Sequence, residues 1–82
     1  MESLWNVYLL RCRDGSLYCG IAKNLVRRIK MHESSKGSKY VRSRLPVRLV
    51  WFKYVENKSA ALKEEARIKR LGKVRKLRMV AR

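Results

Sequence analysis

The chain has 82 residues, the length of one small domain, with room for one modest hydrophobic core and no second lobe. Lysine and arginine number 22 against 6 aspartates and glutamates, so the formal net charge is +16 at pH 7. A field of this sign attracts polyanions, and nucleic acid is the commonest polyanionic partner. The composition therefore predicts a single domain over residues 1–82 that binds nucleic acid.

The sequence pattern also excludes membrane-spanning and secreted classes of protein. No apolar run approaches the roughly 20 residues that span a bilayer. The N-terminus has neither the basic region nor the small-residue cleavage site of a signal peptide. We therefore expect a cytoplasmic protein with no membrane partner, in which Cys12 and Cys19 stay reduced. Two cysteines without a second Cys or His pair do not make a zinc site.

The first predicted element is a β-hairpin. Residues 4–11 and 17–22 are rich in large side chains that alternate in polarity, which is typical of strands. Asp14 and Gly15 lie between them, and this dipeptide is a strong turn signal. The register depends on whether the turn has two or three residues, because a shift of one residue exchanges the two faces of a strand.

The burial pattern favours the three-residue turn. With two residues in the turn, Tyr8 and Tyr18 point to opposite faces of the hairpin. With three, Gly15 takes the left-handed conformation and Tyr8 faces Gly20. Both tyrosines then share a face with Asn6. The other face becomes uniformly apolar, with Trp5, Val7, Leu9, Leu17, Cys19 and Ile21.

A helix, a loop and a third strand follow the hairpin. Asn24 is a good N-cap and predicts a helix over residues 25–33. The basic segment over residues 34–46 is a loop with at most one helical turn, around residues 38–43. Residues 47–55 form the third strand, because valine, tryptophan, phenylalanine and tyrosine dominate them.

Two helices complete the chain. Ser59 is the expected N-cap of a helix over residues 60–71, which Gly72 ends. A basic helix over residues 73–82 follows the core of residues 5–71. Its expected inward side chains are Val74, Leu77 and Val80. The order of elements is therefore ββαβαα.

One carboxylate interrupts the apolar side of the helix over residues 60–71. A single stripe at helical spacing contains Ala61, Glu64, Ile68 and Leu71. An inward carboxylate is costly unless it is paired or binds a metal. A salt bridge from Glu64 to a buried arginine explains this position as well as a functional role does. Glu65 lies about 100° further round the helix and is expected to pair with Lys69 in solvent.

These residues, in this order, resemble the GIY-YIG nuclease family. Tyr8 corresponds to the tyrosine that ends the first triplet. Tyr18 and Gly20 correspond to the first and last residues of the second triplet. Arg28 corresponds to the arginine on the following helix, and Glu64 corresponds to the glutamate that holds a divalent metal. The resemblance extends over most of the chain and is strongest to small stand-alone bacterial members.

The chain departs from the family pattern at several positions. Asn6 and Val7 replace the glycine and isoleucine of the first triplet. Cys19 replaces the isoleucine of the second triplet, and Ile21 stands where repair nucleases of this type often carry a lysine. His32 corresponds to a histidine present in some branches only.

The resemblance implies a fold, an activity and a metal. The implied fold is α+β, with a three-stranded antiparallel sheet flanked by helices. The implied activity is metal-dependent hydrolysis of phosphodiester bonds in DNA, structure-selective or related to repair, with one Mg²⁺ or Mn²⁺ on Glu64. The implied catalytic residues are Tyr8, Tyr18, Arg28, His32 and Glu64, and the supporting motif residues are Gly20 and Asn24.

The chemistry suits these residue types. Arg28 would contact the scissile phosphate, and either tyrosine can serve as general base if nearby cations lower its pKa from about 10. We expect Tyr8, Tyr18 and Arg28 to converge on one concave face beside Glu64. Taken singly, each tyrosine is better explained as an ordinary strand residue, and His32 is slightly better explained as a helix-surface residue.

Basic and aromatic residues around the motif are candidates for nucleic-acid contacts. This set contains Arg27, Lys36, Lys39, Tyr40, Arg42 and Arg44. A solvated helix face and a mobile crossover loop explain the same residues without a binding role. With no appended specificity domain, we expect recognition through nucleic-acid structure or through a protein partner.

Two other functions compete with the nuclease. One is a non-catalytic module that binds DNA or RNA on the same scaffold, and the other is an RNA-associated basic protein with chance similarity to the motif. An inward Glu64 favours the nuclease, because a binding module does not need this carboxylate.

Overall fold

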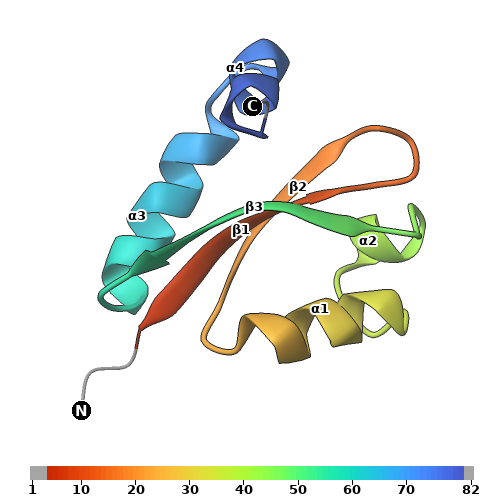
Figure 1. Ribbon diagram of the computed structural model, residues 1–82, viewed down its shortest axis with the longest axis horizontal. Coiled ribbons are helices and arrows are strands. Elements are labelled where there is room, and N and C mark those ends of the chain that lie inside the picture. The colour runs from red at the N-terminus through yellow and green to blue at the C-terminus, as the bar shows by residue number, and fades with distance from the viewer. Residues whose placement is uncertain (1–3, 81–82) are drawn as a thin grey trace.

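The computed structural model describes residues 4–80. Its elements are β1 (Trp5–Arg11), β2 (Leu17–Ala22), α1 (Leu25–Glu33), α2 (Lys39–Arg42), β3 (Arg48–Val55), α3 (Lys58–Lys69) and α4 (Lys73–Val80). The strands form one antiparallel sheet in the order β2-β1-β3 (Figure 1). The α+β class and the three-stranded antiparallel sheet flanked by helices are therefore confirmed. None of the helices over residues 4–80 is long and apolar enough to cross a membrane.

The hairpin has the register of the three-residue turn. Tyr8 pairs with Gly20 and Leu10 pairs with Tyr18. Gly15 has a φ of 85°, the left-handed conformation that glycine adopts most readily. Because residues two apart on a strand share a face, both tyrosines point to the same side of the sheet, and this prediction is confirmed.

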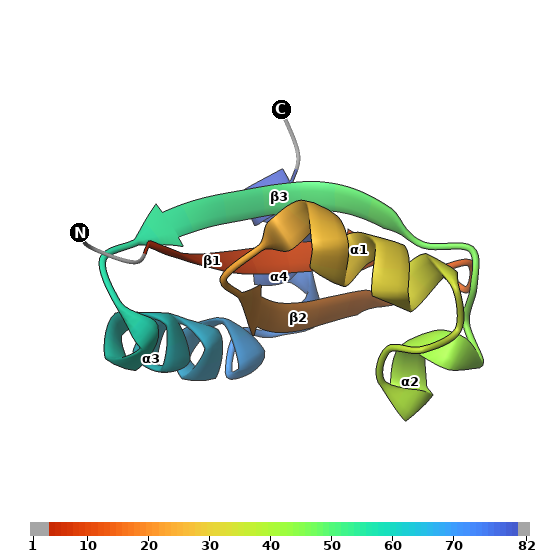
Figure 2. The ribbon, with the colours of Figure 1, turned by 90° about the horizontal axis from the view of Figure 1, so that it is seen from below.

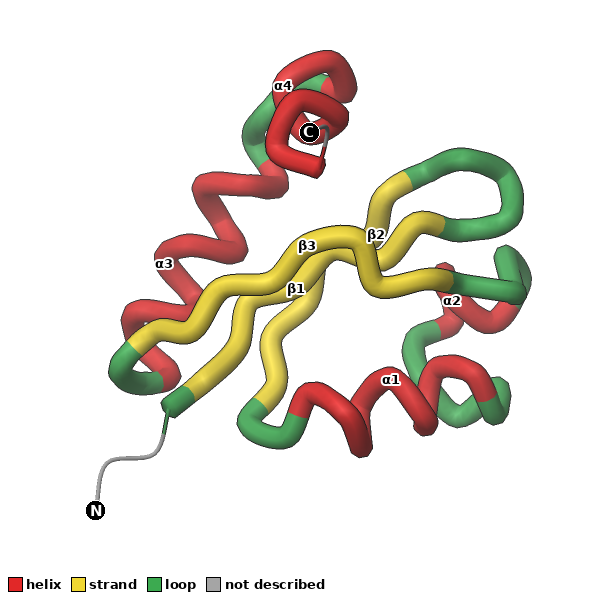
Figure 3. Tube along the Cα trace, in the orientation of Figure 1, coloured by secondary structure: helices red, strands yellow, loops and turns green. Residues whose placement is uncertain are grey.

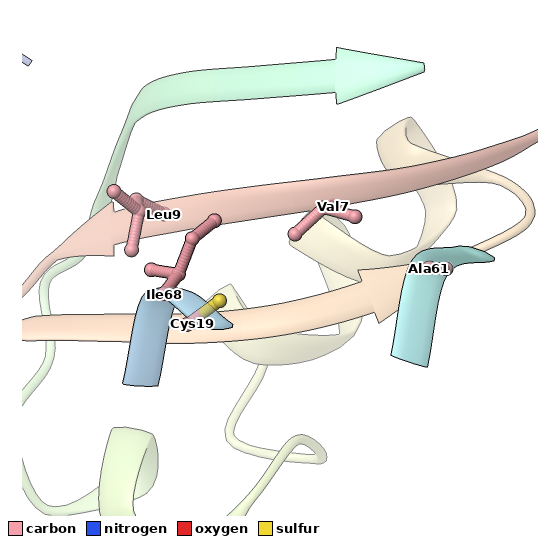
Figure 4. Close-up of a cluster of buried hydrophobic side chains, with 5 residues drawn as sticks. All are labelled: Val7, Leu9, Cys19, Ala61 and Ile68. Carbon is pink, nitrogen blue, oxygen red and sulfur yellow. The ribbon is translucent and has the colours of Figure 1, made fainter. Parts of the chain in front are cut away.

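Helices cover both faces of the sheet. In Figures 1 and 3, α1 and α2 lie on one side of the strands, and α3 and α4 lie on the other. On the α3 side, Val7, Leu9 and Cys19 pack against Ala61 and Ile68 (Figure 4). Met79 and Val80 of α4 extend this cluster. The apolar face predicted for the hairpin is therefore the one that α3 covers.

The opposite face carries a second, smaller core. Here Tyr8, Leu10 and Ala22 pack against Leu25 and Ile29 of α1, which lies along this side of the sheet (Figure 2). The central strand β1 thus contributes alternate side chains to two cores, and all its residues from position 6 to position 10 are buried.

Three details of the helices differ from expectation, the first being that α3 ends at Lys69 with Arg70 as its C-cap, before Gly72. The N-cap of α3 is Asn57, whose Oδ1 accepts a hydrogen bond of 2.8 Å from Ala60 N, so the helix begins before Ser59. Asparagine is as good an N-cap as serine, and here it comes earlier. Val74 is 64% exposed because α4 contacts the core through its last turn. The expected end of α4, at residues 81–82, lies outside the described residues.

Candidate active site

Three aromatic rings meet on the α1 side of the sheet. Tyr8 comes from β1, Tyr18 from β2 and His32 from the last turn of α1. Their centroids are 6.4 Å apart for the two tyrosines, 6.1 Å for Tyr8 and His32, and 5.5 Å for Tyr18 and His32. Tyr8 and His32 are fully buried, whereas Tyr18 is partly exposed. Tyr18 is therefore the ring through which this aromatic cluster reaches solvent.

A hydrogen bond of 3.0 Å joins the Tyr8 hydroxyl to His32 Nε2. Burial raises the pKa of Tyr8 to about 12, although the neighbouring Arg28 guanidinium acts in the opposite direction. Burial, assisted by the charge of Arg28, lowers the pKa of His32 below its ordinary value. At neutral pH the pair is therefore a neutral phenol hydrogen-bonded to an uncharged imidazole, and burial disfavours proton transfer between them.

Arg28 supplies the positive charge beside the aromatic cluster. It lies on α1, one turn before His32, and its charge acts on both His32 and Tyr8. Its Nε is buried and has no hydrogen-bond partner among the described residues. A buried donor normally has a partner, and a phosphate oxygen is a strong acceptor for arginine. A depression of about 250 Å³, lined in part by Arg27 and Asn24, lies beside it.

Two glycines make room for the buried rings. A Cβ at Gly20 would lie 2.5 Å from Tyr8 Oη and 3.1 Å from Tyr18 Cε2. A Cβ at Gly37 would collide with Nδ1 of His32. Gly20 belongs to the predicted motif, but sequence reasoning missed Gly37. The only signal for it was a glycine in the loop five positions after the histidine.

Asn24 has the predicted role at the start of α1. Its Oδ1 accepts a hydrogen bond of 3.0 Å from the backbone N–H of Arg27. The side chain thereby satisfies one of the free N–H groups of the first turn. This cap begins the helix that carries Arg28 and His32, so it helps to place both of them over the sheet.

Tyr40 and Arg44 make contacts with other side chains of the protein. Tyr40 stacks on Tyr18, with centroids 6.0 Å apart, and the Arg44 guanidinium lies 3.8 Å from the Tyr40 centroid. Arg44 also forms an ion pair of 3.0 Å with Asp14. These contacts tie α2 to the hairpin turn. Of the predicted nucleic-acid contacts, the exposed ones are Arg27, Lys36, Lys39, Tyr40 and Arg42.

Glu64 does not join the aromatic cluster. The helix α3 covers the face of the sheet opposite the tyrosine rings, because Val7 and Cys19 point toward it and Tyr8 points away. The expected convergence of Glu64 with the tyrosines and Arg28 is therefore corrected. Helical spacing correctly predicted that Glu64 faces the sheet, but it did not indicate which face of the sheet.

Two cations hold the Glu64 carboxylate. Arg67 donates from Nε to Oε1 at 2.9 Å and from Nη2 to Oε2 at 2.7 Å, and Lys53 Nζ lies 3.4 Å from Oε2. Hydrogen bonds from Arg67 lower the pKa of Glu64 to about 2. The predicted salt bridge from Glu64 to an arginine is thus present, although this arginine, Arg67, is exposed rather than buried. Sequence reasoning missed both Lys53 and Arg67 as partners.

This arrangement does not fit the divalent ion that the resemblance implied. Mg²⁺ requires oxygen ligands in near-octahedral geometry, and both oxygens of Glu64 already accept hydrogen bonds from cations. Over residues 4–80, no group of three or more His, Cys, Asp or Glu side chains could hold a metal ion. A cation placed at Glu64 would also be repelled by Arg67 and Lys53. The residues around Glu64 therefore do not fit a divalent metal.

Glu65 and the cysteines have structural roles. Glu65 pairs with Lys69 at 3.3 Å as predicted, but its side chain is only 19% exposed rather than solvated. Both cysteines are free thiols and are buried in this structure. Burial, followed by the charge of Glu65, raises the pKa of Cys19 to about 11. The Cys19 thiol is therefore an inert part of the core.

Comparison with known proteins identifies similar chains in many bacteria. Residues 4–78 match the family model described as the GIY-YIG catalytic domain. A UPF0213 protein of Oceanobacillus iheyensis is 48% identical over 80 residues, which are 98% of this chain and 93% of that protein. A UPF0213 protein of Vibrio cholerae is 45% identical over 82 residues, which are 99% of this chain and 81% of that protein.

A solved structure has the same fold. The solution NMR structure of a UPF0213 protein from Bacillus halodurans superimposes with a TM-score of 0.61 at 42% sequence identity, covering 94% of this chain and 82% of that chain. The names of these relatives state no substrate. Proteins with the matched domain are generally endonucleases and typically use a divalent metal.

Proposed function

Because the chain belongs to the GIY-YIG catalytic-domain family, we propose that it is a nuclease that hydrolyses phosphodiester bonds in nucleic acid, with DNA as its main substrate. The observation that carries the proposal is the buried Nε of Arg28, which has no partner within residues 4–80, beside the Tyr8–His32 hydrogen bond. A net charge of +16 supports a polyanionic substrate.

The residues of the aromatic cluster divide the chemistry between them. Phosphodiester hydrolysis needs an oriented water molecule and relief of the charge that develops on the phosphoryl oxygens. Arg28 can supply this relief, because its free donor matches a phosphate oxygen. Tyr18 is the partly exposed ring, so we assign it the contact with the attacking water. Tyr8 and His32 are buried behind it, and their role is to position Tyr18, whose ring packs against both of theirs.

A non-catalytic nucleic-acid-binding module is the second candidate. The observation that favours it is the ion pairing of Glu64 with Arg67 and Lys53 on the far face of the sheet. A domain that has lost cleavage would keep its charge and its scaffold. Binding without cleavage on every substrate would establish this alternative.

The deciding assay incubates purified protein with labelled branched, duplex and single-stranded DNA, and with RNA, in Mg²⁺, Mn²⁺ or EDTA. Arg28→Ala should lower the single-turnover rate at saturating protein by about 100-fold or more, the range for a lost transition-state donor. Lys63→Ala removes the same charge from the exposed side of α3 and should cleave like the wild type. Equal rates in the two variants would contradict the proposal.

Comparing the reactions in Mg²⁺, Mn²⁺ and EDTA tests separately whether Glu64 binds a metal. Cleavage that requires Mg²⁺ and disappears in Glu64→Gln would show that Arg67 releases the carboxylate during the reaction. Cleavage that persists in EDTA would agree with the geometry described above, in which the Glu64 oxygens are already occupied.

A further inference from the structure

A groove on the α1 side of the sheet lies outside the aromatic cluster. Its volume is about 500 Å³. Phe52 and Tyr54 of β3 form one wall, and Leu25 and Val26 at the start of α1 form the other. Asn6 of the central strand also lines it. The groove is therefore open and largely apolar, and its polar lining residues are Asn6, Lys23 and Asn24.

The aromatic wall is exposed to solvent. Phe52 is 45% exposed and Tyr54 is 62% exposed. They lie two residues apart on one strand and therefore share a face, and their rings meet at 83° with centroids 5.5 Å apart. Alternate aromatic residues on an exposed sheet face are the usual platform on which proteins stack unpaired bases.

Asn6 offers an unused acceptor in this groove. Its residue is only 4% exposed, and its Nδ2 donates to the backbone carbonyls of Ala22 and Lys23, both at 3.4 Å. The two carbonyls fix the orientation of the amide, because only its nitrogen can donate to them. Oδ1 is buried without a partner among the described residues. A buried acceptor of this kind gains from a ligand that brings an N–H group.

The groove adjoins the positive charge of the candidate active site. Lys23 and Asn24 line both the groove and the depression beside Arg28. A nucleotide in the groove would thus have its phosphate next to Lys23, in the direction of Arg28. This continuity and the net charge of +16 favour a polyanion over an uncharged ligand.

We propose that this groove binds one unstacked nucleobase of single-stranded nucleic acid. The base stacks on the face of one of the rings of Phe52 and Tyr54, which meet nearly at right angles, and one of its N–H groups donates to Asn6 Oδ1. The inference rests on the proposed function for its choice of substrate and deepens it, since a base paired within a duplex cannot enter the groove. The substrate is accordingly a single strand, a flap or a branch with an unpaired end.

The test measures binding by fluorescence anisotropy in EDTA, and gel electrophoresis after each measurement checks that the ligand is intact. The ligands are an oligothymidylate, an abasic chain of the same length, and an oligothymidylate methylated at N3. In the wild type, loss of the bases or of the N3 donor should weaken binding at least about fivefold. The methylated ligand tests Asn6 without any change to the protein.

A paired variant tests the aromatic wall. Phe52→Leu with Tyr54→Leu should weaken binding of the oligothymidylate at least about fivefold and leave binding of the abasic chain unchanged. Leu62→Ala, an exposed apolar control on α3, should bind every ligand like the wild type. Equal affinity of the double variant and the wild type for oligothymidylate would overturn the proposal, as would an equal loss on the abasic chain.

Three further outcomes are distinguishable. If the groove instead joins two copies of the chain, sedimentation will show a wild-type dimer that the double variant loses, with no dependence on bases. Base-dependent binding without cleavage on any substrate would support the groove and reject the nuclease. Cleavage without base-dependent binding would reject the groove alone.

Discussion

A methyl group added at Gly20 tests the packing on which the aromatic cluster depends. The new Cβ would lie 2.5 Å from Tyr8 Oη and 2.6 Å from its Cζ. Close C···O contacts in proteins are about 3.3 Å, so the Tyr8 ring must move by roughly 0.8 Å. Tyr8 is fully buried, and its hydroxyl lies 3.0 Å from His32 Nε2. Such a movement would break or lengthen this hydrogen bond.

The expected cost has two parts. Overpacking a core costs about 1–3 kcal/mol, and leaving a buried hydrogen-bonding group unsatisfied costs about 1–3 kcal/mol. We expect Gly20→Ala to lower the free energy of unfolding by roughly 2–4 kcal/mol, since some of the strain will relax. In a domain of this size the Tm should fall by about 10 °C or more.

Urea and thermal unfolding, followed by circular dichroism, measure this cost. Gly72→Ala is the matched control, because a Cβ at Gly72 meets nothing within 4 Å. Adding Tyr8→Phe to Gly20→Ala removes the hydroxyl from the contact, so the double variant should be more stable than the sum of the single effects predicts. A Gly20→Ala protein as stable as the Gly72→Ala control would refute the packing argument.

Three further predictions concern charge. The folded protein lowers the pKa of His32 below 6.5, so His32 stabilises the fold above that pH and this contribution is lost as the pH falls below it. Urea unfolding at pH 7.5 and pH 5.5 should show the loss in the wild type and not in His32→Gln. The pKa of Glu64 falls from 4.5 to about 2, so its contribution is present above pH 4.5 and is lost as the pH falls toward 2. Glu64→Gln should therefore be less stable than the wild type at pH 7, with the difference vanishing near pH 2 in an acid titration followed by circular dichroism. Replacing Lys39 and Arg42 with glutamine should weaken binding about equally for unrelated duplex sequences and should reduce the salt slope by about 0.9 per lost contact. An unchanged slope would move the duplex-binding surface away from α2.

The elements that local patterns specify were predictable from the sequence. A strand repeats every two residues, so the apolar alternation of residues 5–11 and 17–22 and the glycine at position 15 together selected one register, which placed Tyr8 and Tyr18 on one face. Asn24 indicated the start of α1 because its own side chain accepts the hydrogen bond that caps the helix. Each of these predictions depends only on residues that lie within a few positions of one another in the sequence.

The parts that depend on how elements pack were not predictable. Helical spacing indicated that Glu64 faces the sheet, but the path of the chain from β3 to α3 decides which face it meets. The amino-acid types of β3 indicated a strand, but not that α1 leaves Phe52 and Tyr54 exposed. Gly37 matters only because the loop after α1 folds back over His32. Each of these facts belongs to tertiary packing.

The turn between β1 and β2 also restricts how this chain can change in length. Inserting or deleting one residue between Cys12 and Ser16 would shift the pairing of β2 by one position and exchange its two faces. Tyr18 would then point toward α3 and Cys19 toward His32, so a single change of length would dismantle both cores. An insertion between β3 and α3 leaves every strand pair in register. We therefore expect changes of length to be tolerated better in the other loops, and one-residue insertions or deletions across the turn should lower the free energy of unfolding more than the same changes between β3 and α3.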